Sequence, residues 1–103
     1  MQQAKFTIGQ MIHHVLFNYR GVIVDVDFKF LGSDQWYEQV AVSRPPKNQP
    51  WYHVLVDNAT HQTYAAEQNL EPSEDISPIH HPLVEHYFVK LENGLYIPKG
   101  RRN

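Results

Sequence analysis

The chain has 103 residues, which is enough for one domain with a modest core and too short for two. Apolar residues make up 42% and charged residues 19%, as in globular rather than disordered chains. The formal charge is −2, with nine lysines and arginines against eleven acids, which argues mildly against strong nucleic-acid binding but leaves room for a local basic patch.

Several kinds of protein are excluded by what the sequence lacks. Without cysteine there is no disulfide framework, thiolate nucleophile or cysteine zinc site. The first ten residues contain no long apolar segment, so we expect no signal peptide. The longest apolar run, GVIV, is far shorter than a membrane span. We therefore expect a soluble, cytoplasmic protein with no membrane partner.

Two strands are predicted in the first third of the chain. Apolar residues run through 11–17, which suits a strand covered on both faces, and Asn18 and Gly21 suit a tight turn. Over residues 22–29 apolar and mainly charged residues alternate, which is the clearest two-residue period in the chain. The pattern predicts an antiparallel pair of strands joined at that turn.

The middle of the chain predicts a second hairpin. Residues 36–42 fit either one short strand or a turn of helix, and the three prolines of 43–50 mark a loop. Residues 51–56 alternate again, DNAT at 57–60 is typical of a turn, and 61–66 supply the partner strand. The residues that follow are predicted to leave the sheet.

The last third predicts a linker and a helix. Residues 71–81 are acidic and interrupted by proline, so we expect a surface linker. Apolar spacings of three and four residues over 82–91 predict a short amphipathic helix that ends near Gly94, before an extended piece and a basic tail. Short strands with one late C-terminal helix predict a mainly β fold, a small SH3-like or half-open β-barrel that protects its strand edges.

No metal or acid–base site is supported by residue spacing. The adjacent pairs His13 and His14, and His80 and His81, would point to opposite faces of a strand, so neither pair chelates a metal easily. Asp25 shares one strand face with a second aspartate two residues on, where the two could form an acid–base pair or a cation site. We expect a solvated sheet face instead, with no metal and no cofactor.

The densest group of polar and aromatic side chains lies in residues 49–70. His53 and Asp57 are four residues apart on one strand, more than ~10 Å along the chain, so they do not form a dyad. Tyr52 and His53 point to opposite faces, and no serine lies in a nucleophile motif. We expect aromatic core packing, local hydrogen bonds at His53 and Glu67, and no enzyme activity.

Nearly the whole chain resembles the HspQ family, also described as YccV-like or hemimethylated DNA-binding proteins. The resemblance rests on KFTIGQMIHH, YRGVIVDVDFKF, QPWYHVLVD, TYAAEQNL and HHPLVEHYFVKLENGLYIPKGRRN, which occur in the order expected for the family. The family signature maps onto mainly structural positions: Gly9, Gly21, Asp25, Trp51, Tyr52, His53, Asp57, Tyr64 and Glu67. The departures are His13 and His14, where a basic residue is expected beside the histidine, and Ala65, where relatives tend to carry a larger residue.

The resemblance implies a small β-barrel that self-associates, with a trimer as the expected assembly. It also implies a cytoplasmic heat-shock protein without catalytic residues. Members are described as binding hemimethylated DNA, including near the replication origin. They are further linked to turnover of denatured or mutant replication initiator DnaA, and to adaptor or specificity-enhancing work for ATP-dependent proteases such as Lon.

Two functions therefore stay open. The first is a stress-response protein that modulates degradation of client proteins, with a protease and its clients as partners. The second is hemimethylated-DNA binding, which the missing cation near the first strand weakens. The contacts for DNA or for a protein partner would come from Lys5, Tyr19, Arg20, Lys29, Arg44, Lys47, Lys99, Arg101 and Arg102.

Tyr19, beside Arg20, is the best-exposed candidate for an apolar contact with a base methyl group. Cations scattered over the surface would favour the protein partner, and clustered cations would favour DNA. An exposed edge strand or the apolar stripe of residues 83–91 could form an interface between copies.

Overall fold

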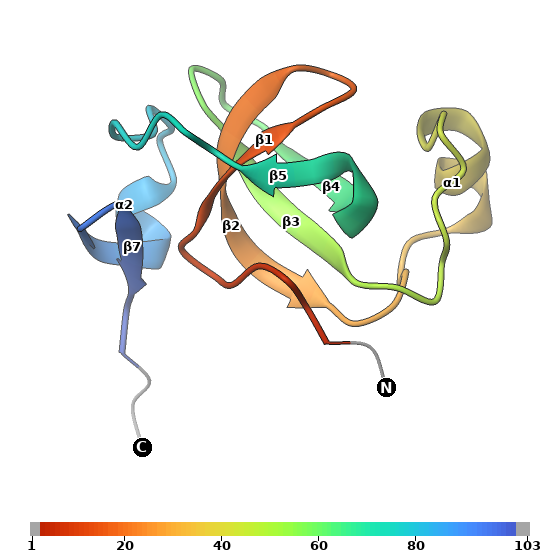
Figure 1. The fold of residues 1–103 in the computed structure, drawn as a ribbon, viewed down its shortest axis with the longest axis horizontal. Helices are drawn as coiled ribbons and strands as arrows, with labels where there is room; N and C mark the ends of the chain where they lie inside the picture. The colour runs from red at the N-terminus through yellow and green to blue at the C-terminus, as the bar shows by residue number, and fades with distance from the viewer. Residues whose placement is uncertain (1–2, 101–103) are drawn as a thin grey trace.

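The computed structural model describes residues 3–100 and has a mainly β fold (Figure 1). A five-stranded antiparallel sheet takes its strands in the order β4-β3-β2-β1-β5, and a separate hairpin joins β6 to β7. The strands are β1 (Met11–His14), β2 (Tyr19–Asp27), β3 (Trp51–Val56), β4 (Gln62–Ala66), β5 (Leu70–Pro72), β6 (Phe88–Glu92) and β7 (Leu95–Pro98). The helices are α1 (Asp34–Val40), α2 (Val84–Tyr87) and one 3₁₀ turn (Glu67–Asn69).

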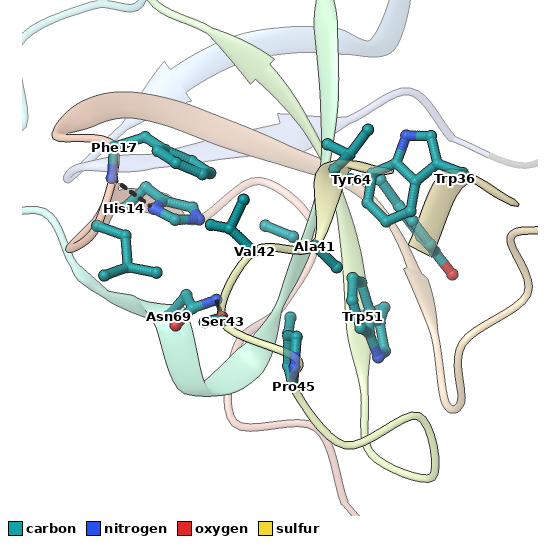
Figure 2. A pocket seen from close by; sticks show the side chains of 14 residues that line it. His14, Phe17, Trp36, Ala41, Val42, Ser43, Pro45, Trp51, Tyr64 and Asn69 are labelled. Carbon is teal, nitrogen blue, oxygen red and sulfur yellow. Dashed lines mark hydrogen bonds between the residues drawn. The ribbon is translucent and has the colours of Figure 1, made fainter. Parts of the chain in front are cut away.

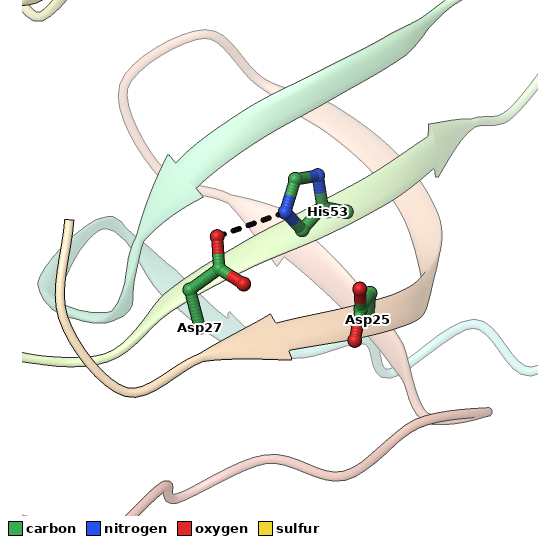
Figure 3. Close-up of side chains that lie close together, drawn as sticks. All are labelled: Asp25, Asp27 and His53. Carbon is green, nitrogen blue, oxygen red and sulfur yellow. Dashed lines mark hydrogen bonds and ion pairs between the residues drawn. The ribbon is translucent and has the colours of Figure 1, made fainter. Parts of the chain in front are cut away.

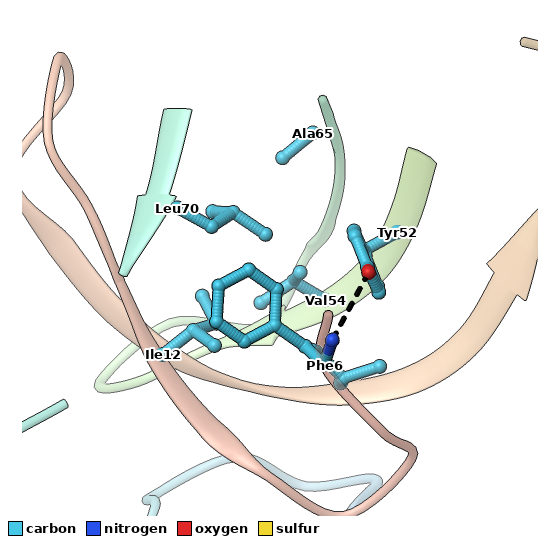
Figure 4. Packing of buried hydrophobic residues seen from close by; sticks show 7 residues of the cluster. Phe6, Ile12, Tyr52, Val54, Ala65 and Leu70 are labelled. Atoms are coloured by element: carbon cyan, nitrogen blue, oxygen red, sulfur yellow. Dashed lines mark hydrogen bonds between the residues drawn. The ribbon is translucent and has the colours of Figure 1, made fainter. Parts of the chain in front are cut away.

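The five-stranded sheet curls around one hydrophobic core (Figure 4). This core takes side chains from all five strands and from the N-terminal segment: Phe6, Ile12, Ile23, Tyr52, Val54, Ala65 and Leu70. A flat sheet could not bring side chains from both of its end strands into one cluster. The sheet nevertheless does not close, because β4 and β5 remain its two ends. The small, mainly β fold predicted from the sequence is therefore confirmed, with a sheet that is not closed into a barrel.

The outer face of the sheet carries two further clusters. At one end α1 packs through Tyr37 on Trp51, and at the other end the β6–β7 hairpin packs through Tyr96 in a cluster that includes Leu55. Trp51 and Leu55 are two residues either side of His53 on β3, so they share its face. The outer face therefore has an uncovered strip around His53, between the two packed ends.

The first hairpin differs from the prediction in where it turns. β1 ends at His14, and residues 15–18 form the β1–β2 turn, in which the N–H of Asn18 donates to the carbonyl of His14 at 2.8 Å. Asn18 takes the positive φ of 55°. Gly21 lies inside β2 rather than in the turn, and a Cβ there would come within 2.5 Å of the carbonyl oxygen of Leu55. Close strand approach, not turn geometry, is what requires this glycine.

The C-terminal third departs most from the prediction. Residues 70–72, predicted to leave the sheet and begin the linker, form β5 and pair with β1. Of the helix predicted over 82–91, the structure contains only α2, because residues 88–92 form β6. Asn93 and Gly94 both have positive φ and connect β6 to β7. Asn-Gly between two apolar segments is a hairpin signal, and here it outweighs the helical spacing.

Helix α1 resolves the ambiguity of residues 36–42, most of which are helical. Ser33 caps this helix, because its Oγ accepts the N–H of Trp36 at 3.0 Å. Residues 3–100 thus contain two α-helices: the sequence predicted a helix in the last third of the chain and left this one open between strand and helix. Within residues 3–100, each helix is too short and too polar to cross a membrane.

Candidate functional site

An apolar groove lies beside β4, between the β1–β2 turn and α1, with a volume of about 350 Å³. We call it the β4 groove. Its lining comes from four parts of the chain: the β1–β2 hairpin (His14, Phe17 and Tyr19), α1 (Trp36 and Val40), β3 (His53) and β4 (Gln62, Thr63 and Tyr64). A smaller pocket adjoins it, and Figure 2 shows His14 and Phe17 on one side of that pocket and Trp36 and Tyr64 on the other.

Exposed apolar side chains gather around the groove and the smaller pocket beside it. Phe17 in the β1–β2 turn keeps 56% of its surface exposed, and Val42, just after α1, keeps 65%. Leu16 and Val40 are also exposed. Apolar groups concentrated in this way are typical of binding surfaces. The sequence reasoning missed it because residues 15–17 were expected inside a strand, although three apolar residues directly before an Asn turn were an available signal.

His14 and Tyr19 form an uncharged inner wall of the groove. The His14 ring stacks on Phe17 at a centroid distance of 4.7 Å, and its Nδ1 accepts the N–H of Phe17 at 3.1 Å. Burial lowers the pKa of His14, and the charge of His13 lowers it further, so the ring stays neutral. Tyr19, expected to be exposed, is half-buried, and its hydroxyl shares a 2.6 Å hydrogen bond with Thr63 Oγ1.

Where the groove reaches the outer face, polar side chains meet in the uncovered strip around His53, which itself lines the groove. Asp27 Oδ2 accepts the hydroxyl hydrogen of Tyr64 at 2.7 Å and lies 3.0 Å from His53 Nε2 (Figure 3). The Tyr64 hydroxyl in turn accepts the N–H of Leu31 at 3.0 Å. Desolvation, reinforced by the hydrogen bond to Asp27, holds the pKa of Tyr64 well above its usual range. Tyr64 therefore remains a donor and fixes the position of the Asp27 carboxylate.

Three residues of this strip could hold a metal ion. The potential ligand atoms of Asp25, Asp27 and His53 lie within 4.8 Å of one another, a mixed carboxylate and imidazole set. The sequence predicted a solvated face for the two aspartates and did not bring His53 to them, because the register between β2 and β3 shifts just before Asp25. Asp25 is exposed and accepts the N–H of Val26 at 2.9 Å. Hydrogen bonding alone therefore accounts for the arrangement.

A matching tyrosine–carboxylate pair is buried on the inner face of the sheet. The hydroxyl of Tyr52 donates to Glu67 Oε1 at 2.6 Å and accepts the N–H of Phe6 at 3.2 Å. The same carboxylate oxygen accepts the N–H of Lys5 at 2.8 Å. The pair fastens the N-terminal segment over the core. Tyr52 and His53 thus point to opposite faces of β3, as strand alternation predicts.

Asp57 pairs with Arg20 rather than with a histidine on its own strand. Arg20 Nη2 lies 3.0 Å from Asp57 Oδ2, and the two side chains are only 13% and 12% exposed. The guanidinium also donates to the carbonyls of Ser77 and Pro78, while the N–H of His80 donates to Asp57 Oδ1. Arg20 therefore fastens the 73–80 segment to the sheet and presents little of its charge to a partner.

The remaining signature positions shape the fold. Gly9 has a φ of 94°, and a Cβ there would lie 2.0 Å from the carbonyl oxygen of Tyr96, so glycine is required. Trp51 is buried and its Nε1 donates to the carbonyl of Pro46 at 3.1 Å. These contacts hold the chain in place and offer no group to a substrate.

The cations proposed as contacts come from separate segments, and several are already paired. Arg44 Nη2 lies 3.4 Å from Glu38 Oε1, and Lys47 Nζ lies 3.2 Å from Asp34 Oδ1. No ion pair within residues 3–100 involves the exposed lysines Lys5, Lys29 and Lys99. Arg101 and Arg102 lie outside the described residues.

The chain matches one family model over residues 4–95, and that model is described as hemimethylated DNA-binding protein YccV like. The matched region includes the β4 groove and both tyrosine–carboxylate pairs. It is the family that the resemblance of the sequence motifs indicated.

Proposed function

The chain belongs to the YccV-like family of hemimethylated DNA-binding proteins, and from that premise we propose that it binds client polypeptides and modulates their degradation by an ATP-dependent protease. The observation that carries the proposal is the β4 groove, whose lining contains no lysine, arginine, aspartate or glutamate. An apolar groove of this kind favours a polypeptide over a phosphate backbone, which is bound by clustered cations.

The state of the cations supports the same choice. Arg20 is enclosed by Asp57 and backbone carbonyls, and Arg44 and Lys47 face acidic side chains. A DNA-binding surface needs several free cations on one face, because each phosphate contact adds to affinity. The pairing of these three cations with acidic side chains favours a protein partner over DNA.

We further propose that the protein has no catalytic activity of its own. We extend the proposal to a cytoplasmic stress-response protein that acts as a homo-oligomer, with a trimer as the expected assembly. A homo-oligomer would present one groove per copy, and several grooves together would strengthen binding to an extended client.

A degradation assay tests the proposal. A denatured client such as DnaA is incubated with an ATP-dependent protease such as Lon, with and without this protein. We expect the half-life of the client to change, and Phe17→Ser to lose most of that effect. Phe28→Ser is the matched control, because Phe28 is 63% exposed but lines a different pocket. Unchanged client turnover together with no binding in a pull-down would contradict the proposal.

Hemimethylated-DNA binding is the second candidate function, and the family match favours it. Within residues 3–100, Lys5, Lys29 and Lys99 are the exposed cations that no ion pair involves, and they could serve it. Gel shifts with hemimethylated, fully methylated and unmethylated duplexes over a salt series test this function. A preference for the hemimethylated duplex, with affinity that falls steeply with salt, would support it. A flat salt response would mean few phosphate contacts and would count against it.

A further inference from the structure

We propose that the β4 groove binds an extended, uncharged apolar polypeptide segment as an added strand, hydrogen-bonded to the free edge of β4. This inference rests on the proposed function and specifies how a client segment would be recognised. Two separate features of the groove lead to it: its position at a strand edge and its apolar, uncharged lining.

The groove lies along the edge of β4 and extends onto the outer face of the sheet at His53. Successive side chains of a strand point to opposite faces, yet Gln62, Thr63 and Tyr64 all line the groove. A cavity that contacts three successive residues of a strand must lie at the edge of that strand. β4 is the end strand of the sheet, so within residues 3–100 no neighbouring strand occupies this side.

Backbone groups of Gln62 and Tyr64 point toward this free edge. The N–H of Val56 donates to the carbonyl of His61 across the β3–β4 pair. Hydrogen-bonded positions alternate along an antiparallel pair, so odd-numbered residues of β4 bond to β3 and even-numbered residues face away. Ala66 is buried. Gln62 and Tyr64 therefore present two N–H and two C=O groups to the groove, and no backbone bond to these groups exists elsewhere in residues 3–100.

An edge with unpaired groups is a template for an extended peptide, which supplies the complementary N–H and C=O groups. Phe17 and Val40 border the groove and would contact alternate side chains of the added strand. Because none of the lining residues carries a fixed charge, complementarity favours an uncharged apolar segment. Such segments are buried in folded proteins and exposed in denatured ones, which matches the clients of the proposed function.

The backbone pairing is tested with a fluorescein-labelled peptide of about nine alternating valine and threonine residues, a usual strand length. Binding to the full chain is measured by fluorescence anisotropy. Two N-methylated versions remove the N–H groups from one edge of the peptide or from the other, while the side chains stay. We expect one version to bind at least about tenfold more weakly and the other within about twofold of the parent. Equal affinities of the two versions would overturn strand addition.

Protein variants test the rim and the edge separately. Phe17→Ser should weaken peptide binding at least about tenfold, and the control Phe28→Ser by less than about twofold. Gln62→Pro removes an N–H that faces the groove and should also weaken binding. If Gln62→Pro does not fold, the pair of N-methylated peptides still decides the question. Equal binding by Phe17→Ser and the wild type would overturn the site.

Client degradation measured with the same variants separates this inference from the proposed function. Peptide binding that depends on Phe17 and on one peptide edge, with unchanged client turnover, supports the groove and overturns the degradation role. Client turnover that responds equally to the wild type and to Phe17→Ser overturns the groove as the client site and leaves the degradation role in place. If the peptide does not bind and Phe17→Ser converts an oligomer to monomers, a second copy occupies the groove and the inference is overturned.

Discussion

Tyr52 and Tyr64 make the same set of hydrogen bonds on opposite faces of one sheet. Each hydroxyl donates to a carboxylate, Glu67 at 2.6 Å and Asp27 at 2.7 Å, and each accepts a backbone N–H from outside the five-stranded sheet. Tyr52 is completely buried in the core, whereas Tyr64 is half-buried in the wall of the β4 groove. The same chemistry fastens the fold on one face and shapes a surface on the other.

Burial decides what each pair contributes. Without the hydroxyl of Tyr52, the carboxylate of Glu67 would lose a partner in a place that water does not reach. At Tyr64, water from the groove can take the place of the lost hydroxyl. We therefore expect the inner pair to govern stability and the outer pair, with the groove beside it, to govern binding.

The largest expected effect is that of Tyr52→Phe, which should lower the free energy of unfolding by about 2 kcal/mol, as for other hydrogen bonds to a buried charged group. Urea denaturation measures this change. Tyr87→Phe is a suitable control, because the Tyr87 hydroxyl makes no hydrogen bond within residues 3–100 and should change stability by less than about 0.5 kcal/mol. Equal losses from the two variants would show that the buried pair is not stabilising.

Tyr64→Phe should cost about 1 kcal/mol, because Asp27 keeps His53 as a partner and water replaces the hydroxyl. The same urea titration gives the comparison with Tyr52→Phe directly. If the two variants lost the same stability, burial would not be what distinguishes the two pairs.

Phe17→Ser should change the free energy of unfolding by less than about 1 kcal/mol, since the side chain is mostly exposed in the β1–β2 turn. The same variant should lose peptide binding. A large loss of stability would mean that Phe17 holds the fold together through its stack on His14, and its loss of binding could then not be assigned to the groove.

The smallest effect concerns pH and the two neighbouring histidines of β1. Hydrogen bonds to Asn18 and Glu71 raise the pKa of His13 above its usual 6.5. The contribution of His13 to the free energy of unfolding is therefore full below pH 6.5 and is lost as the pH rises through the raised pKa. His14, with a lowered pKa, acts in the opposite direction: its contribution is present above pH 6.5 and is lost as the pH falls.

Because the side chains of His13 and Glu71 keep 32% and 53% of their surface exposed, solvent screening should limit the His13 effect to less than about 1 kcal/mol. Urea midpoints at pH 5, 6, 7 and 8 for the wild type and His13→Gln measure it. His13→Gln should lack the stability that His13 contributes at low pH, so its urea midpoint should fall less than that of the wild type as the pH rises. An identical pH profile for the two proteins would contradict the assignment.

Part of the inner core could be predicted from the sequence, because strand alternation depends on neighbouring residues alone. Alternation over 51–56 correctly placed Tyr52 inside and His53 outside. Alternation over 22–29 was wrong about the face of Ile23, which lies in the inner core while Val22 and Val24 pack in the outer cluster, because the strand register shifts after Ile23. The groove could not be predicted in this way. It depends on where β1 ends, on the position of α1, and on the register shift that brings Asp27 to His53. These features come from contacts between distant segments.

The C-terminal prediction failed for a related reason. Residues 83–91 have the spacing of an amphipathic helix, but Phe88 packs against Tyr96 at a ring-centroid distance of 5.2 Å across a hairpin. The turn residues Asn93 and Gly94 decide between the two arrangements. Helical spacing of apolar residues over a short segment is therefore weak evidence for a helix when a strong hairpin turn follows it.

The central claim is that the free edge of β4 is the binding surface. Residue-resolved amide exchange, with and without the valine–threonine peptide, tests it most directly. We predict that the amides of Gln62 and Tyr64 become protected by about tenfold or more when the peptide binds, while those of Thr63 and Ala65, already bonded to β3, change little. Unchanged exchange at Gln62 and Tyr64 under saturating peptide, or protection confined to β5, would contradict the claim.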